Sequence, residues 1–117
     1  MPRPSETARN AFLALLPPDP DVSTRAMFGQ LVGFLNGNMF MGLFGDRLFL
    51  LLSEADRVRV LEQGGTDFTT KGYVMLPDGW IEHPRQASRW VATALEMGRA
   101  LPPKARSATR QRSRRGA

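Results

Sequence analysis

The stretch MFGQLVGFLNGNMFMGLFGDRLFLLL, residues 27–52, decides the fold of this chain. It contains three apolar runs, at Leu31–Leu35, Met39–Phe44 and Leu48–Leu52. Asn36-Gly37 supplies the two positive-φ residues of a type I′ turn, and Gly45-Asp46 fits a II′-like turn. Turns this tight connect neighbouring antiparallel strands, so the stretch predicts a strand meander.

The three runs do not alternate apolar with polar residues. A strand with one face in water shows such alternation, whereas a strand covered on both sides is apolar throughout. We therefore expect both faces of this sheet to be covered, by helices, by a second subunit or by a partner. The methionines and phenylalanines of the runs then form core, or an adaptable apolar groove or dimer face.

Two elements are expected before the meander. Ser5 is suited to cap a helix that ends at Pro17-Pro18, because proline disfavours continuation of a helix. The segment from Ser23 to Phe28 then predicts a first strand, followed by a bulge or bend at Gly29.

Three elements are expected after the meander. Residues 53–56 form a capping box for a helix with Ala55, Val58 and Leu61 as its apolar positions, which stops at Gly64-Gly65. Phe68 and Tyr73–Leu76 predict a strand. His83 at the N-cap and Pro84 at the first position begin the last helix. Its apolar stripe is Ala87, Trp90, Val91, Ala94, Leu95, Gly98 and Leu101.

The predicted order is helix, four strands, helix, strand, helix. This order indicates an α+β fold with a mainly antiparallel sheet, in which three helices flank a four-stranded N-terminal meander. We expect residues 1–101 to form this domain. Residues 102–117 lack large apolar side chains and are expected to be a disordered basic tail.

The net charge of +5 is divided unevenly along the 117 residues. Residues 1–101 hold ten basic and eleven acidic side chains, whereas residues 102–117 hold six basic and no acidic ones. A basic tail can bind nucleic acid weakly and without sequence preference, or serve only as a solubilising terminus. The candidate nucleic-acid residues are Lys104, Arg106, Arg110, Arg112, Arg114 and Arg115.

The residues that carry most enzyme chemistry are scarce. The chain has no cysteine and a single histidine, His83, which is expected to cap a helix. Its serines are not in a nucleophile elbow, its acids are scattered, and no glycine pair forms a phosphate loop. We therefore expect a protein that is not an enzyme, with no catalytic residues, no cofactor and no metal. The sequence also predicts no membrane span and no signal peptide, so a cytoplasmic location is expected.

One set of residues leaves a binding site open. An apolar pocket, with a cation that holds an anionic group, would make the protein a small ligand-binding protein or an enzyme. The same residues could instead belong to an interface with a protein partner or a second copy. The candidates are Arg25, Met27, Phe28, Phe40, Lys71 and Tyr73.

Four motifs taken together are similar to the TfoX N-terminal domain family. They are Arg25-Ala26-Met27-Phe28-Gly29, Asn36-Gly37-Asn38-Met39-Phe40, Gly45-Asp46-Arg47-Leu48-Phe49-Leu50 and Tyr73-Val74-Met75-Leu76-Pro77. The resemblance covers roughly residues 8–101 and includes the last helix with Trp90. It implies a compact α+β domain, often found in regulators of natural competence (TfoX/Sxy) that act on transcription, and it brings no catalytic residues.

The resemblance and the residues together favour a stand-alone regulatory or protein-interaction module linked to transcription or competence. Such a module would act through a protein partner or self-association, with weak nucleic-acid contact through the tail.

Overall fold

The computed structural model describes residues 3–27, 29–68 and 70–103. Its elements in chain order are α1 (Glu6–Leu15), β1 (Val22–Met27), β2 (Gln30–Leu35), β3 (Asn38–Phe44), β4 (Arg47–Leu51), α2 (Glu54–Glu62), β5 (Thr66–Asp67), β6 (Tyr73–Met75), the 3-10 helix η1 (Asp78–Glu82) and α3 (Pro84–Arg99). The six strands form one antiparallel sheet in the order β1-β2-β3-β4-β6-β5. The predicted α+β class and its meander are confirmed.

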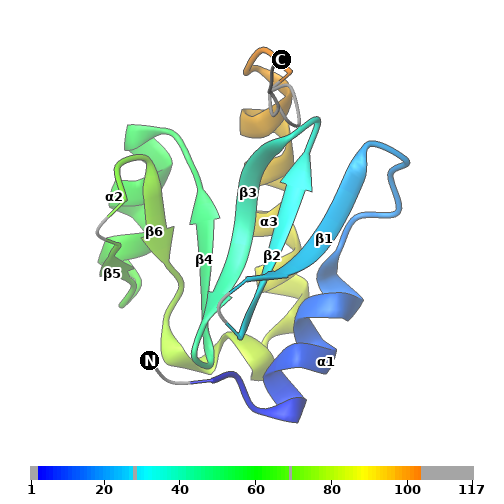
Figure 1. Cartoon of the computed structure of the whole chain (residues 1–117). Helices are drawn as coiled ribbons and strands as arrows, with labels where there is room; N and C mark the ends of the chain where they lie inside the picture. Colours follow the sequence, from blue (N-terminus) through cyan, green and yellow to red (C-terminus); the bar gives the residue numbers. More distant parts are fainter. Residues whose placement is uncertain (1–2, 28, 69, 104–117) are drawn as a thin grey trace.

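The helices lie on one face of this sheet (Figure 1). Helices α1 and α3 pack on each other and on the central strands, whereas α2 packs on β5 and β6. The strand pairing places one row of side chains across the whole sheet beneath these helices. That row contains Thr24, Gly33, Met41, Leu50, Val74 and Asp67.

The core between sheet and helices is apolar. Met41, Leu50 and Val74 of the central strands are fully buried there, together with Phe12 of α1 and Val60 of α2. Gly98 of α3 lies against Leu35 and Phe40, since a Cβ at this position would make ordinary contacts with them at 3.4 and 3.5 Å. Helix α3 therefore packs directly on β2 and β3.

The turns and helix ends follow local sequence chemistry. Asn36 and Gly37 have φ values of 51° and 83°, as a type I′ turn requires, and Gly45 has a φ of 60°. The Ser5 hydroxyl accepts a hydrogen bond from the Ala8 N–H at 3.1 Å and caps α1. His83 occupies the N-cap of α3 with Pro84 next to it, although the His83 side chain makes no capping hydrogen bond.

Strand β3 contains one residue more than its pairing with β2 uses. Gly33 pairs with Met41 and Phe34 pairs with Met39, so Phe40 is the extra residue of a β-bulge. Phe40 is fully buried next to Gly98 of α3. The bulge therefore turns both Phe40 and Met41 toward the helices.

Three local expectations differ from the structure. In α2 the fully buried side chain is Val60, whereas Val58 is 48% exposed, because strands β5 and β6 pack against the other side of this short helix. The strand expected from Phe68 onward is two strands, β5 and β6, with Phe68 in the connection between them. The turn expected at residues 77–79 continues as the 3-10 helix η1.

Both faces of the sheet are expected to be covered, by helices, by a second subunit or by a partner. The described helices cover one of these faces (Figure 1). Among the described residues, no helix is long and apolar enough to cross a membrane.

Replacing Ser53 by alanine should lower the free energy of unfolding by about 1 kcal/mol, because α2 loses its N-cap. The Ser53 hydroxyl accepts from the Asp56 N–H at 3.2 Å, and it donates to the Asp56 carboxylate at 3.1 Å. Urea unfolding of S53A and of S88A measures the difference. Ser88 is an exposed residue inside α3, so S88A should change the stability by no more than about 0.5 kcal/mol. Equal stabilities of the two variants would contradict the capping role.

Candidate functional site

The sheet face opposite the helices carries its own row of side chains. The pairing registers continue through Arg25, Val32, Gly42, Phe49, Met75 and Thr66, one residue from each strand. Side chains alternate between the two faces of a strand, so this row points away from the buried row beneath the helices. We call this side the open face.

An aromatic cluster occupies the open face over β3, β4 and β6. The rings of Phe49 and Phe68 are stacked, with centroids 4.6 Å apart and planes 9° apart. Phe44 meets Phe68 edge-on at 5.9 Å, and Tyr73 meets Phe49 edge-on at 5.9 Å. These four rings, Phe44, Phe49, Phe68 and Tyr73, form the open-face cluster, and their geometries are those that aromatic pairs prefer.

The centre of the cluster is held in one position. The Phe49 ring lies across Gly42, where an added Cβ would come within 2.4 Å of the Phe49 Cζ atom. Phe68 stacks on Phe49, which is only 5% exposed although no helix covers it. Only glycine at position 42 leaves room for the Phe49 ring. Gly42 therefore allows this ring to lie across β3 in the open face.

The rim of the cluster is more open to solvent. Phe44 is 37% exposed and Met27 is 36% exposed. Phe34 and Met39, which pair across β2 and β3, are half-buried. Single exposed apolar residues are normal on proteins, but several of them on one sheet face that also carries an aromatic cluster are typical of an interaction surface.

The charges on the open face are cationic. The Arg25 guanidinium lies 4.9 Å from the centroid of the Phe34 ring, within cation–π distance. Arg47 donates two hydrogen bonds to the Leu76 carbonyl, at 3.0 and 3.2 Å, and forms an ion pair with Asp78 at 3.2 Å. None of the open-face positions that the described strands provide is an aspartate or a glutamate.

The structure distributes the six candidate pocket residues over separate places. Arg25 and Met27 lie on β1, and Tyr73 lies on β6, with three strands between them. Phe40 is buried on the helix side. Lys71 is exposed in the turn before β6, and Phe28 lies outside the described residues. The described members therefore do not line one cavity, although Arg25, Met27 and Tyr73 share the open face.

The six basic tail residues, which begin at Lys104, also lie outside the described residues. Within the described ranges, no three or more histidine and acidic side chains are grouped as a metal ion would require.

Three members of the open-face cluster, Phe44, Phe49 and Phe68, are not among the candidate site residues predicted from the sequence. The register that follows from the Gly45-Asp46 turn could have placed the first two, since it pairs Phe44 with Arg47 and Gly42 with Phe49. Phe68 carried no such signal, because its place depends on how the connection between β5 and β6 folds back.

Helices packed on one face of an antiparallel sheet define an α+β domain. The model of the TfoX N-terminal domain family matches residues 14–97, more than half of the chain, so the chain belongs to this family. The resemblance of the turn motifs is thereby confirmed, and the family points to a regulatory or competence-related module. Comparison with curated proteins and with solved structures gave no match.

Tyr73 provides a test of the packing of the open-face cluster. Its hydroxyl donates to the Met39 carbonyl at 2.8 Å, and burial raises the pKa of its side chain above the ordinary value of 10.0. A group with a raised pKa in the folded state stabilises the fold fully below its unfolded pKa, and this stabilisation is lost as the pH rises through the folded pKa. We therefore expect the free energy of unfolding to fall as the pH rises above 10.0, the ordinary pKa of tyrosine.

Tyr73 is the single tyrosine of the chain, so tyrosinate absorbance reports this group alone. The native protein should titrate at a higher pH than the protein in denaturant, and Y73F should lack the transition. Identical titration curves in the native and unfolded states would contradict the burial of this hydroxyl.

Proposed function

We propose that this protein is a non-catalytic regulatory module that acts in the cytoplasm by binding another protein through the open face. The observation that carries the proposal is an apolar, aromatic sheet face that none of the described helices covers. The family supports it, because the TfoX N-terminal domain points to a regulatory or competence-related role. A role in transcription or competence is the finer form of this proposal.

The composition of the open face supports a protein partner. Interface centres are rich in aromatic residues, methionine and arginine and poor in acidic residues. The open face offers the same combination, with Phe44 and Met27 exposed at its rim and Arg25 next to Phe34. Such a surface suits a partner that brings apolar side chains together with carboxylates, which would pair with Arg25.

The alternative, a small-molecule site in which Arg25 or Lys71 anchors an anion, has less support. Arg25 is on β1 at one edge of the sheet, and Lys71 is in the turn before β6. Three strands separate them, and Phe40 is unavailable to either because it is buried on the helix side. The described residues of this hypothesis are therefore not gathered around either cation.

Phe44→Ser should weaken partner binding by about tenfold or more, because loss of an aromatic hot-spot residue from an interface often costs about 2 kcal/mol or more. The control is Val58→Ser, which changes a residue that is 48% exposed on α2, whereas Phe44 is 37% exposed on β3. Chemical crosslinking with affinity capture identifies the partner, and isothermal titration calorimetry compares the three proteins. Sedimentation velocity measures self-association in the same samples. A wild type that is monomeric and captures no protein in a Phe44-dependent way would disprove the proposal.

The tail is proposed to add weak, salt-sensitive contact with nucleic acid. Residues 102–117 carry six cations and no acid, and neutralised phosphates release counterions on binding. We expect the full chain to bind duplex DNA, single-stranded DNA and RNA at low salt, with a steep loss at higher salt, and a 1–101 truncation to bind none of them. Equal binding by the two proteins would remove the tail from the proposal.

A further inference from the structure

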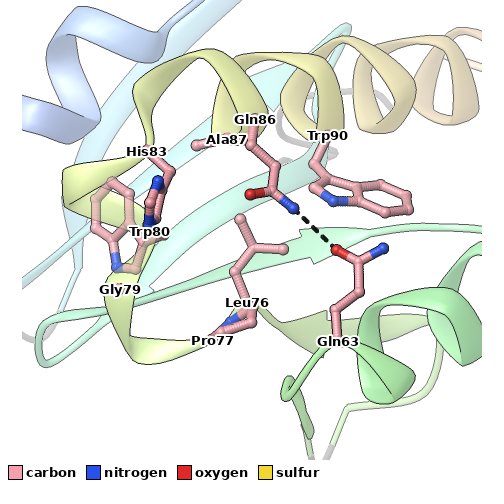
Figure 2. Close-up of a pocket in the computed structure, with 9 residues that line it drawn as sticks. All are labelled: Gln63, Leu76, Pro77, Gly79, Trp80, His83, Gln86, Ala87 and Trp90. Carbon is pink, nitrogen blue, oxygen red and sulfur yellow. Dashed lines mark hydrogen bonds between the residues drawn. The ribbon is translucent and has the colours of Figure 1, made fainter.

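A cavity of about 280 Å³ opens on the helix side of the molecule, away from the open face. Its walls come from four segments, namely the end of α2, the chain after β6, η1 and the first turns of α3 (Figure 2). None of its lining residues belongs to the open-face cluster or to the basic tail. The lining residues are Gln63, Leu76, Pro77, Gly79, Trp80, His83, Gln86, Ala87 and Trp90.

Part of the wall is rigid and apolar. Leu76, Trp80 and Ala87 are 2%, 4% and 1% exposed, so they are held by the core behind them. The Trp80 indole N–H donates to the Asp46 carbonyl at 2.8 Å, so this ring offers its apolar surface and not its donor. These residues form a preformed surface against which a flat apolar group can pack without rearrangement of the fold.

The aromatic groups stand at two ends of the cavity. Figure 2 shows Trp80 and His83 together at one end and Trp90 at the other, with Gln86 between them and Gln63 beside Trp90 on the side of α2. Indole and imidazole rings stack well on planar heteroaromatic molecules. Both tryptophans of the chain therefore line this single cavity.

Besides the ring nitrogens of His83 and Trp90, the wall carries two side-chain amides. Gln86 Nε2 donates to Gln63 Oε1 at 2.9 Å, and this bond joins α3 to α2 across the cavity (Figure 2). An amide has two N–H donors and an acceptor oxygen, so the bond uses one donor of Gln86 and leaves its oxygen to accept. The pair can therefore present a donor and an acceptor side by side to a ligand.

The lining contains no lysine, arginine, aspartate or glutamate. An ion placed here would lose its hydration without gaining a counter-charge, and that exchange is unfavourable. A volume of about 280 Å³ is also just below the roughly 300–1,000 Å³ of sites for drug-sized ligands. The ligand that fits is therefore uncharged and has one or two rings.

We propose that this cavity binds a small, uncharged, planar heteroaromatic molecule with an amide-like donor–acceptor edge, which is the chemistry of a purine or pyrimidine base. The ring stacks on one aromatic end of the cavity, and its edge pairs with Gln63 and Gln86. This inference is independent of the proposed protein interface, because the two surfaces share no residue.

The full-length protein is titrated with adenine and uracil up to millimolar concentration, with benzoate as a charged ring and benzene as a ring without a polar edge. Tryptophan fluorescence and the two indole N–H signals in NMR spectra report binding directly. Saturable shifts of the indole signals are expected with a neutral base and not with benzoate. Equal binding of benzoate would overturn the proposal, and so would the failure of both bases to shift these signals.

Two variants test the location and the polar edge. Gln86→Ala removes an exposed amide and should weaken base binding about tenfold, as expected for a lost hydrogen-bonding partner. Gly79→Leu should fill the cavity and abolish binding. A Cβ there would meet Glu82 Oε1 and His83 Cδ2 at 3.7 and 3.8 Å, which are ordinary contacts. Glu96→Gln, an exposed change further along α3, is the control.

Each variant is first compared with the wild type by circular dichroism and thermal unfolding, so that loss of binding is not loss of fold. If G79L and Q86A are folded and bind the base as the wild type does, the base is not in this cavity and the proposal is wrong. A free base, its nucleoside and a dinucleotide then distinguish a free ligand from a base within a strand. The small volume predicts tightest binding of the free base, and the reverse order would overturn the size argument.

Discussion

Successive side chains of a strand point to opposite faces of the sheet, and this alternation governs the arrangement of the whole molecule. Strands β3 and β4 are almost entirely apolar, so helices that cover one face leave an apolar row on the other. Leu50 and Phe49 show the result in adjacent positions. Leu50 is buried beneath the helices, whereas Phe49 is buried by Gly42 and Phe68 on the far side. The protein thus has a helix-covered core and a second, smaller apolar layer made of its own rings.

Features that depend on a few consecutive residues could be predicted from the sequence. The Asn36-Gly37 turn, the serine caps of α1 and α2 and the start of α3 at Pro84 each follow from local backbone chemistry. The buried side of α2 could not be predicted, because a helix of nine residues allows more than one apolar stripe. There the position of β6 decides that Val60 is buried, and this position is a property of the whole fold.

The candidate sites were harder to predict for the same reason. Arg25, Met27 and Tyr73 lie on the open face, but they are brought to it by pairing across the strands between them. Phe40 looked equivalent to its neighbours in sequence, and only the bulge in β3 sends it to the helix side. The cavity beside Trp80 and Trp90 required four segments to meet. No sequence motif predicts such a cavity, because each segment contributes only one to three of its lining residues.

The bulge in β3 has a further consequence for the length of the chain between the two tight turns. Between the Asn36-Gly37 turn and the bulge, the open-face residues of β3 have odd residue numbers, as Met39 does. Between the bulge and the Gly45-Asp46 turn they have even residue numbers, as Gly42 does. Phe40 absorbs this difference of one residue. Loss of Phe40 would therefore leave both faces of the sheet as they are and remove only an aromatic ring from beneath α3. Loss of one residue from β4, whose register is continuous, would exchange its core and surface side chains. A change of one residue in chain length thus preserves the two faces of the sheet at the bulge and exchanges them in β4.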